Sequence, residues 1–218
     1  SSDVCSSDLD GWLDGVQWLP SPNFGERPAG DTVSLVVIHN ISLPPDEFGG
    51  DWVEDFFLNR LNATVHPYFS TISDLQVSAH FYVRRDGRVI QFVGCDRRAW
   101  HAGQSCWCER DNCNDYSVGI ELEGSDNQPY SAEQYAALWP LLDALRARYP
   151  ISAIAGHCHI APGRKTDPGP YFSWGRLRRL LIDQGRTDVV VRIEPEGGPE
   201  VDDTVLQRWP FPLAERPG

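Results

Sequence analysis

The stretch that decides the fold is VSLVVIHN, residues 33–40. Its first six residues form an apolar run rich in β-branched side chains, which is typical of a strand buried on both faces. The run ends in His39 and Asn40, where we expect the strand to give way to a loop rich in Pro and Gly over residues 43–50. Polar residues at the end of a buried strand place candidate chemistry at the edge of a sheet, where ligand sites collect.

Three further segments predict strands outward from this one. An Asp-Gly pair between two apolar runs indicates a β-hairpin over residues 80–93. Residues 117–123 alternate, which predicts a strand with Glu121 and Glu123 on one face and apolar side chains on the other. Residues 151–155 predict a short strand. The hairpin excludes a purely parallel sheet.

Three segments predict helices. Residues 51–58 predict a short helix capped by Asp51. Residues 131–149 show helical spacing and open on a Ser and Gln capping box, with a kink expected at Pro140. Residues 173–182 predict the last helix. The fold class is therefore α+β (mixed α/β): a single domain with a central mixed β-sheet flanked by helices.

The chain divides into three parts. Residues 1–10 repeat SSD, and we interpret them as a non-native or disordered leader. Residues 11–182 hold all the strong patterns, and the 218-residue chain has room for one sizeable core. Residues 183–218 form an acidic, Pro-rich tail whose one strand candidate is residues 189–191. We expect an appendix there rather than a second domain.

Composition excludes several classes of protein. The net charge of −12, from 31 acids against 19 bases, disfavours a nucleic-acid binder, which needs a basic face. No apolar run reaches the length of a membrane span, and no secretory signal is visible. Six Cys do not make a disulfide scaffold, and their spacing matches no common zinc knuckle, so we expect free thiols.

One group of residues has the composition of a metal site. His39 and His157 each follow an apolar strand run, and Asp167 stands ten residues after His157 in a segment rich in Gly and Pro, residues 156–170. Two imidazoles and a carboxylate leave an open fourth position on zinc, which is the catalytic arrangement. Asp167 is equally suited to forming a turn before Pro168 in a surface loop. Spacing alone leaves both interpretations open.

Five stretches occur in the same order as in a known enzyme family. VVIHNISLPPDEFGG, VSAHFYVRRDG, RAWHAG, CNDYSVGIELEG and GHCHIAPGRKTDPGP resemble the AmpD family of N-acetylmuramyl-L-alanine amidases, which act in peptidoglycan recycling. The similarity runs from about residue 11 to residue 182. That family shares its fold with phage lysozyme-like amidases and peptidoglycan recognition proteins. The resemblance therefore implies a peptidoglycan-recognition-protein-like fold.

The resemblance also implies roles for residues. It implies that His39, His157 and Asp167 bind one zinc ion (Zn²⁺) per chain, that Glu121 is the catalytic carboxylate, and that Lys165 supports the transition state. Amide hydrolysis agrees with this set: zinc lowers the pKa of a bound water from 15.7 to about 7. A carboxylate must then carry that proton to the leaving amine, and cations must meet the developing oxyanion.

Some assignments depend on the resemblance alone. Glu121 and Glu123 share a strand face and either suits the chemistry; only the resemblance selects Glu121. It also implies that Asn40 and Arg164 line the substrate cleft. His101, in the stretch RAWHAG, is interpreted as structural or cleft-lining, with no chemical role.

Three features depart from the family pattern: Gly163 replaces a position that is often polar, the chain runs about 36 residues past the last matched helix, and His159 is the third. His159 stands where AmpD-like sequences commonly carry Asp. Residues two apart on an extended segment face the same side, so His159 would approach the metal beside His157 and fill its open position. An active enzyme does not tolerate that. We therefore expect the chain to turn between the two, with His159 hydrogen-bonded within residues 156–170 or standing at the cleft rim.

The predicted function is zinc-dependent hydrolysis of the amide between N-acetylmuramic acid, in its 1,6-anhydro form, and L-alanine. The expected partner is an anhydro-muropeptide, with no nucleic acid and no membrane, and the expected protein is a cytoplasmic monomer. Two alternatives remain open. One is a non-catalytic peptidoglycan-binding module, which typically loses a metal ligand. The other is an exported lytic amidase on the same fold, which would need an export signal.

Overall fold

The computed structural model describes residues 11–183 and 190–191, and a seven-stranded sheet runs through them in the order β1-β5-β4-β9-β3-β10-β11. These strands are β1 Gln17–Trp18, β3 Leu35–Ile41, β4 Phe81–Val83, β5 Val89–Gln91, β9 Ser117–Glu123, β10 Ala153–Gly156 and β11 Val190–Val191. Only the β4–β5 hairpin is antiparallel; the other neighbours in the sheet pair in parallel. The expected mixed sheet is confirmed.

Helices and two small antiparallel ribbons surround the sheet. The helices are α1 Trp52–Phe57, α2 Ala132–Arg148, α3 His157–Ile160 and α4 Trp174–Asp183, with 3₁₀ turns at Phe69–Thr71 and Cys113–Asp115. The ribbons pair β2 (Phe24–Gly25) with β6 (Arg98–Ala99) and β7 (Cys106–Trp107) with β8 (Arg110–Asp111). Among the helices of residues 11–183, none is long and apolar enough to cross a membrane.

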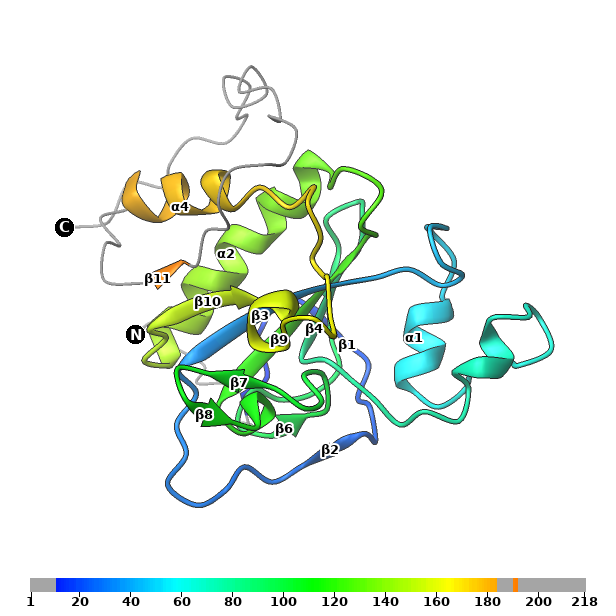
Figure 1. The fold of residues 1–218 in the computed structure, drawn as a ribbon, viewed down its shortest axis with the longest axis horizontal. Helices are drawn as coiled ribbons and strands as arrows, with labels where there is room; N and C mark the ends of the chain where they lie inside the picture. Colours follow the sequence, from blue (N-terminus) through cyan, green and yellow to red (C-terminus); the bar gives the residue numbers. More distant parts are fainter. Residues whose placement is uncertain (1–10, 184–189, 192–218) are drawn as a thin grey trace, which may run out of the picture.

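One face of the sheet packs against α2 and α4, which lie together on the same side (Figure 1). Its core joins Ile38 and Ile120 from the strands to Leu138 and Leu142 of α2 and Leu177 of α4. α2 begins as expected, because the Ser131 side chain accepts from the backbone of Gln134 and the Gln134 side chain accepts from the backbone of Ser131. Burial of these aliphatic side chains is the main force holding the helices on the sheet.

The opposite face is covered by two separate groups. One group places Phe57 of α1 against Tyr82 and Phe92. The other packs Ala102 and Ile160 with Leu35 and Val37, which are alternate residues of β3. His39 follows Val37 on this face of the strand, so β3 carries its imidazole toward this second group.

One local expectation was wrong, and another was confirmed only in part. β3 continues to Ile41, so His39 and Asn40 lie within the strand and not in the loop, because β9 pairs with β3 as far as Ile41 opposite Glu123. Asp51 is the N-cap residue of α1, as expected, but its carboxylate makes no capping bond and accepts from Arg84 instead.

The sheet also includes β11, which pairs with β10 in parallel. Its residues, Val190–Val191, belong to the strand candidate of the tail. Residues 1–10 and most of the tail lie outside the described residues.

Candidate metal centre

Three adjacent parallel strands align the candidate residues in one row. β3 pairs with β9 in a register that sets His39 opposite Glu121. β3 pairs with β10 in a register that sets Ile38 opposite Gly156, so His157 follows at the level of His39. Because paired residues of parallel strands present their side chains to the same face, the register brings two imidazoles and a carboxyl together from residues far apart in sequence.

The chain turns as soon as β10 ends. Residues His157–Ile160 form the one-turn helix α3, and His159 Nδ1 accepts a hydrogen bond from the backbone N–H of Gly156 at 2.9 Å. The expected turn between His157 and His159 is confirmed, and the group of potential ligands found in the described residues does not include His159.

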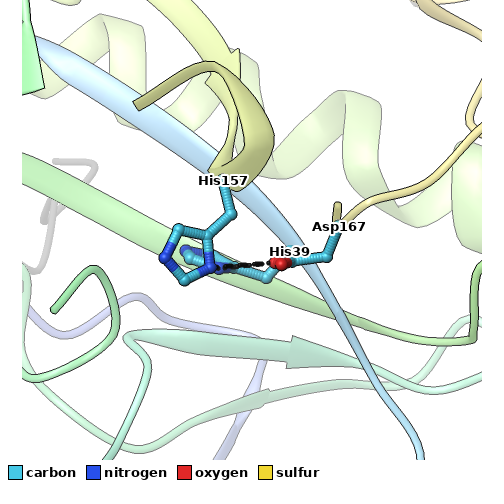
Figure 2. Close-up of side chains that lie close together, drawn as sticks. All are labelled: His39, His157 and Asp167. Carbon is cyan, nitrogen blue, oxygen red and sulfur yellow. Dashed lines mark hydrogen bonds and ion pairs between the residues drawn. The ribbon is translucent and has the colours of Figure 1, made fainter. Parts of the chain in front are cut away.

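The three expected metal ligands converge (Figure 2). His39 Nδ1 lies 3.0 Å from His157 Nδ1 and 3.1 Å from Asp167 Oδ2, and His157 Nδ1 lies 3.0 Å from the same oxygen. Ligand atoms about 2.0–2.1 Å from a tetrahedral zinc are separated by roughly 3.3 Å, so the triangle is close to what zinc needs. All three residues are largely buried.

The remaining ring nitrogens are held by the protein. His157 Nε2 donates to the carbonyl oxygen of Ala102 at 3.0 Å, which leaves Nδ1 with its lone pair. His39 Nε2 lies 2.9 Å from His101 Nδ1. Burial, with a smaller effect from His157, lowers the pKa of His39 to about 4, so its imidazole is neutral at pH 7. A neutral ring nitrogen is the form that binds metal, and the group can hold a metal ion.

The two acids of β9 have different surroundings. Glu123 accepts hydrogen bonds from the backbone N–H of Gly49 at 2.6 Å and of Arg85 at 2.9 Å. Glu121 Oε2 is buried, and no residue within the described part of the chain offers it a hydrogen bond. Burial, and then the charge of Asp167, raise the pKa of Glu121. Glu123 is therefore a structural acid, whereas Glu121 has an oxygen free for chemistry.

Lys165 acts on this group through its charge. Lys165 is exposed. Its positive charge contributes a lowering of the pKa to both His39 and Glu121, which for Glu121 is smaller than the effect of burial. A cation at that position can meet an oxyanion that develops beside the ligands.

Comparison with known protein families shows to which family this chain belongs. The model of the family described as N-acetylmuramoyl-L-alanine amidase matches residues 29–170. The chain belongs to this amidase family. The match includes the three candidate ligands, both acids of β9 and Lys165.

Curated relatives of this amidase agree. It is 51% identical over 182 residues to the 1,6-anhydro-N-acetylmuramyl-L-alanine amidase AmpD of Citrobacter freundii, covering 83% of this chain and 97% of the relative. It is 50% identical over 173 residues to AmpD of Escherichia coli strain K12, covering 78% of this chain and 94% of the relative.

Solved structures confirm the fold of the amidase. A crystal structure of a selenomethionine AmpD derivative matches with a TM-score of 0.76 at 51% identity, covering 78% of this chain and 97% of that one. The amidase AmiD of E. coli, in complex with anhydro-N-acetylmuramic acid-L-Ala-D-γ-Glu-L-Lys, matches with a TM-score of 0.52 at 29% identity, covering 72% and 65%.

The two residues expected to line the cleft of the amidase make bonds within the chain. Asn40 Nδ2 donates to Asp126 Oδ1 at 2.9 Å and to the carbonyl oxygen of Pro168 at 3.1 Å. Arg164 Nη2 donates to the carbonyl oxygens of Ala102 at 2.9 Å and Gln104 at 2.5 Å. Both side chains therefore brace segments that carry or contact metal ligands, and contact with substrate stays a prediction.

Sequence reasoning missed the residues that support the ligands. Tyr130 donates its hydroxyl to the carbonyl oxygen of Pro168 at 2.6 Å, and with Asn40 it fixes the backbone beside Asp167. The carbonyl of Ala102 supports His157, and a backbone carbonyl has no sequence signal. His101 had a signal, its place in the stretch RAWHAG, but no chemical role was assigned to it.

Proposed function

We propose that this amidase hydrolyses the amide between the lactyl group of 1,6-anhydro-N-acetylmuramic acid and L-alanine, in peptidoglycan recycling, with one zinc ion per chain. The observation that carries the proposal is the convergence of His39, His157 and Asp167 beside the unpartnered oxygen of Glu121. The names of the AmpD relatives, which the chain matches over almost their whole length, support the anhydro sugar.

In this proposal His39, His157 and Asp167 hold the ion. Zinc, when bound, polarises the scissile carbonyl and makes a strong nucleophile available at neutral pH. Glu121 takes the proton of the attacking water and delivers it to the amine that leaves from L-alanine. Burial and the charge of Asp167 raise the pKa of Glu121, which favours its uptake of that proton.

Lys165 is proposed to stabilise the negative charge on the carbonyl oxygen in the transition state. Asn40 and Arg164 are proposed to contact the muropeptide through polar atoms that are not used in their intramolecular hydrogen bonds. The electrostatic effect of Lys165 on both His39 and Glu121 supports its place beside the reacting groups.

Mass spectrometry of the products tests the proposal. The zinc-loaded protein is incubated with an anhydro-muropeptide and, separately, with intact cell-wall sacculi. We expect free stem peptide and free anhydro sugar from the first substrate and little release from the second. Release mainly from sacculi would support a lytic amidase, and binding without cleavage of either would support a non-catalytic module.

A further inference from the structure

Two consecutive residues, His101 and Ala102, lie within hydrogen-bond distance of the ring nitrogens of His39 and His157 that face away from Asp167. His101 Nδ1 faces His39 Nε2 at 2.9 Å, and the carbonyl oxygen of Ala102 faces His157 Nε2 at 3.0 Å. The carbonyl can only accept, so it sets the tautomer of His157 unaided. An imidazole can accept or donate, so what His101 does to His39 depends on the partners of its own ring.

Those partners determine the direction of every hydrogen bond. The carbonyl oxygen of Cys113 accepts the hydroxyl hydrogen of Ser117, with the two oxygens 2.5 Å apart. The Ser117 oxygen then accepts from His101 Nε2 at 3.2 Å. A neutral imidazole carries a single hydrogen, and the bond to Ser117 places that of His101 on Nε2. His101 Nδ1 must therefore accept from His39 Nε2, and His39 Nδ1 keeps its lone pair.

The fold builds a specific place for this ring. A Cβ on Gly119 of β9 would lie 2.4 Å from His101 Cγ, so only glycine leaves room for the imidazole where it stands. Asn114 Oδ1 accepts the backbone N–H of His101 at 3.1 Å and of Ala102 at 2.8 Å. The backbone of both residues is thus held to one buried side chain.

We propose that His101 is a positioning residue for the metal centre: it holds His39 as the Nε2–H tautomer, with Nδ1 turned toward Asp167 and His157. Residues 101 and 102 together clamp both imidazoles in the form that binds a divalent cation. The proposal rests on the proposed function, since it takes zinc as the ion. With both tautomers set, the three atoms that converge are all acceptors, and a cation is what satisfies them.

The first test is zinc affinity, measured by competition with a chromogenic chelator. In His101→Phe the ring remains but the acceptor is lost, and we expect the affinity to fall by roughly 10–100-fold. In His101→Asn the side-chain oxygen stands near the place of Nδ1 and can accept, so most of the affinity should return. The matched control is His80→Phe, because His80 is a fully buried histidine whose ring bonds to the backbone of Gly119 and Arg97.

The second test does not need the metal. Nitrogen-15 NMR of the histidine rings in chelator-treated protein should show hydrogen on His39 Nε2 in the wild type and a mixture of tautomers in His101→Phe. Gly119→Ala, which displaces the His101 ring without changing it, should lower zinc affinity in the same direction.

The outcomes separate the two proposals. Wild-type affinity in His101→Phe, or an equal loss in His80→Phe, would overturn the role of His101. A wild-type protein that binds no zinc would overturn the proposed function, and the NMR result would then still decide which tautomer His101 imposes.

Discussion

At the scale of single residues, the two acids of β9 show how surroundings divide one chemical type into two roles. Glu121→Gln removes the proton acceptor but keeps the shape of the side chain, so zinc should stay bound while kcat falls by roughly 10²–10⁴-fold. Glu123→Gln weakens the bonds to the backbone of Gly49 and Arg85. It should lower the free energy of unfolding by about 1–3 kcal/mol and change kcat far less.

Steady-state kinetics on zinc-loaded protein, together with urea unfolding, check both variants. Equal zinc content in the two variants is the control for the metal site. A larger loss of kcat in Glu123→Gln than in Glu121→Gln would show that the roles of the acids are reversed.

His80 gives a prediction about pH. Burial, and then the charge of Arg27, lower its pKa from 6.5 to about 3 in the folded protein. Between those two values the unfolded chain binds a proton that the folded protein does not. The free energy of unfolding should therefore be highest above pH 6.5 and fall as the pH drops toward 3, by up to about 1.4 kcal/mol per pH unit from this group.

Urea unfolding between pH 7 and pH 4 measures this slope. His39 and His101 add to it in the same direction, because burial lowers the pKa of both. His80→Asn keeps an acceptor for the N–H of Gly119 and removes one titrating group, so its slope should be shallower than that of the wild type. Identical slopes would mean that His80 is not a buried neutral histidine.

At the scale of elements, periodicity predicted what depends on local pattern. The alternating residues 117–123 are the strand β9, and the capping box places the start of α2 correctly. The end of β3 was wrong because it depends on how far the neighbouring strand pairs with it. No periodicity indicates α3, a single turn of four residues whose first N–H groups include that of Cys158, which donates to the distant carbonyl oxygen of Asp167.

The residues of the site, like the helices and strands, could be predicted only as far as local sequence pattern carries information. The spacing alone did not decide whether Asp167 forms a turn or binds a metal ion. Only the family resemblance selected the role of metal ligand. What brings Asp167 to the imidazoles is strand register and the bonds of Asn40 and Tyr130 to the backbone of Pro168. These two contacts span 128 and 38 residues. Contacts between residues so far apart in sequence leave no trace in local pattern, so they could not be derived from the sequence.

The one-turn helix α3 gives a prediction at this scale. His159 accepts the N–H of Gly156 and so holds the first turn that carries His157. An aspartate oxygen can accept the same N–H, as helix-capping carboxylates do. His159→Asp should therefore keep one zinc per chain and most of the activity, whereas His159→Leu should lose zinc affinity. Metal analysis and chelator competition check both, and loss of zinc in His159→Asp would contradict the capping role.

At the scale of the whole molecule, the metal centre connects parts of the fold that the chain does not join directly. His39 lies in the middle of the sheet, His157 begins α3, and Asp167 stands in the segment that leads to α4. An ion held by all three exists only when β3, β10 and that segment are in place. The proposed zinc binding is therefore expected to be coupled to the stability of the whole domain.

Thermal unfolding measures this coupling. At a free zinc concentration 100 times Kd, the folded state should gain about 2.7 kcal/mol, which for a domain of this size raises Tm by roughly 5–11 °C. The gain should shrink in acid, because protons compete with a metal ion for imidazole nitrogens. His157→Ala removes one ligand and serves as the control at the same zinc concentration. If zinc shifts the Tm of His157→Ala as much as that of the wild type, the ion binds elsewhere and the three residues are not its site.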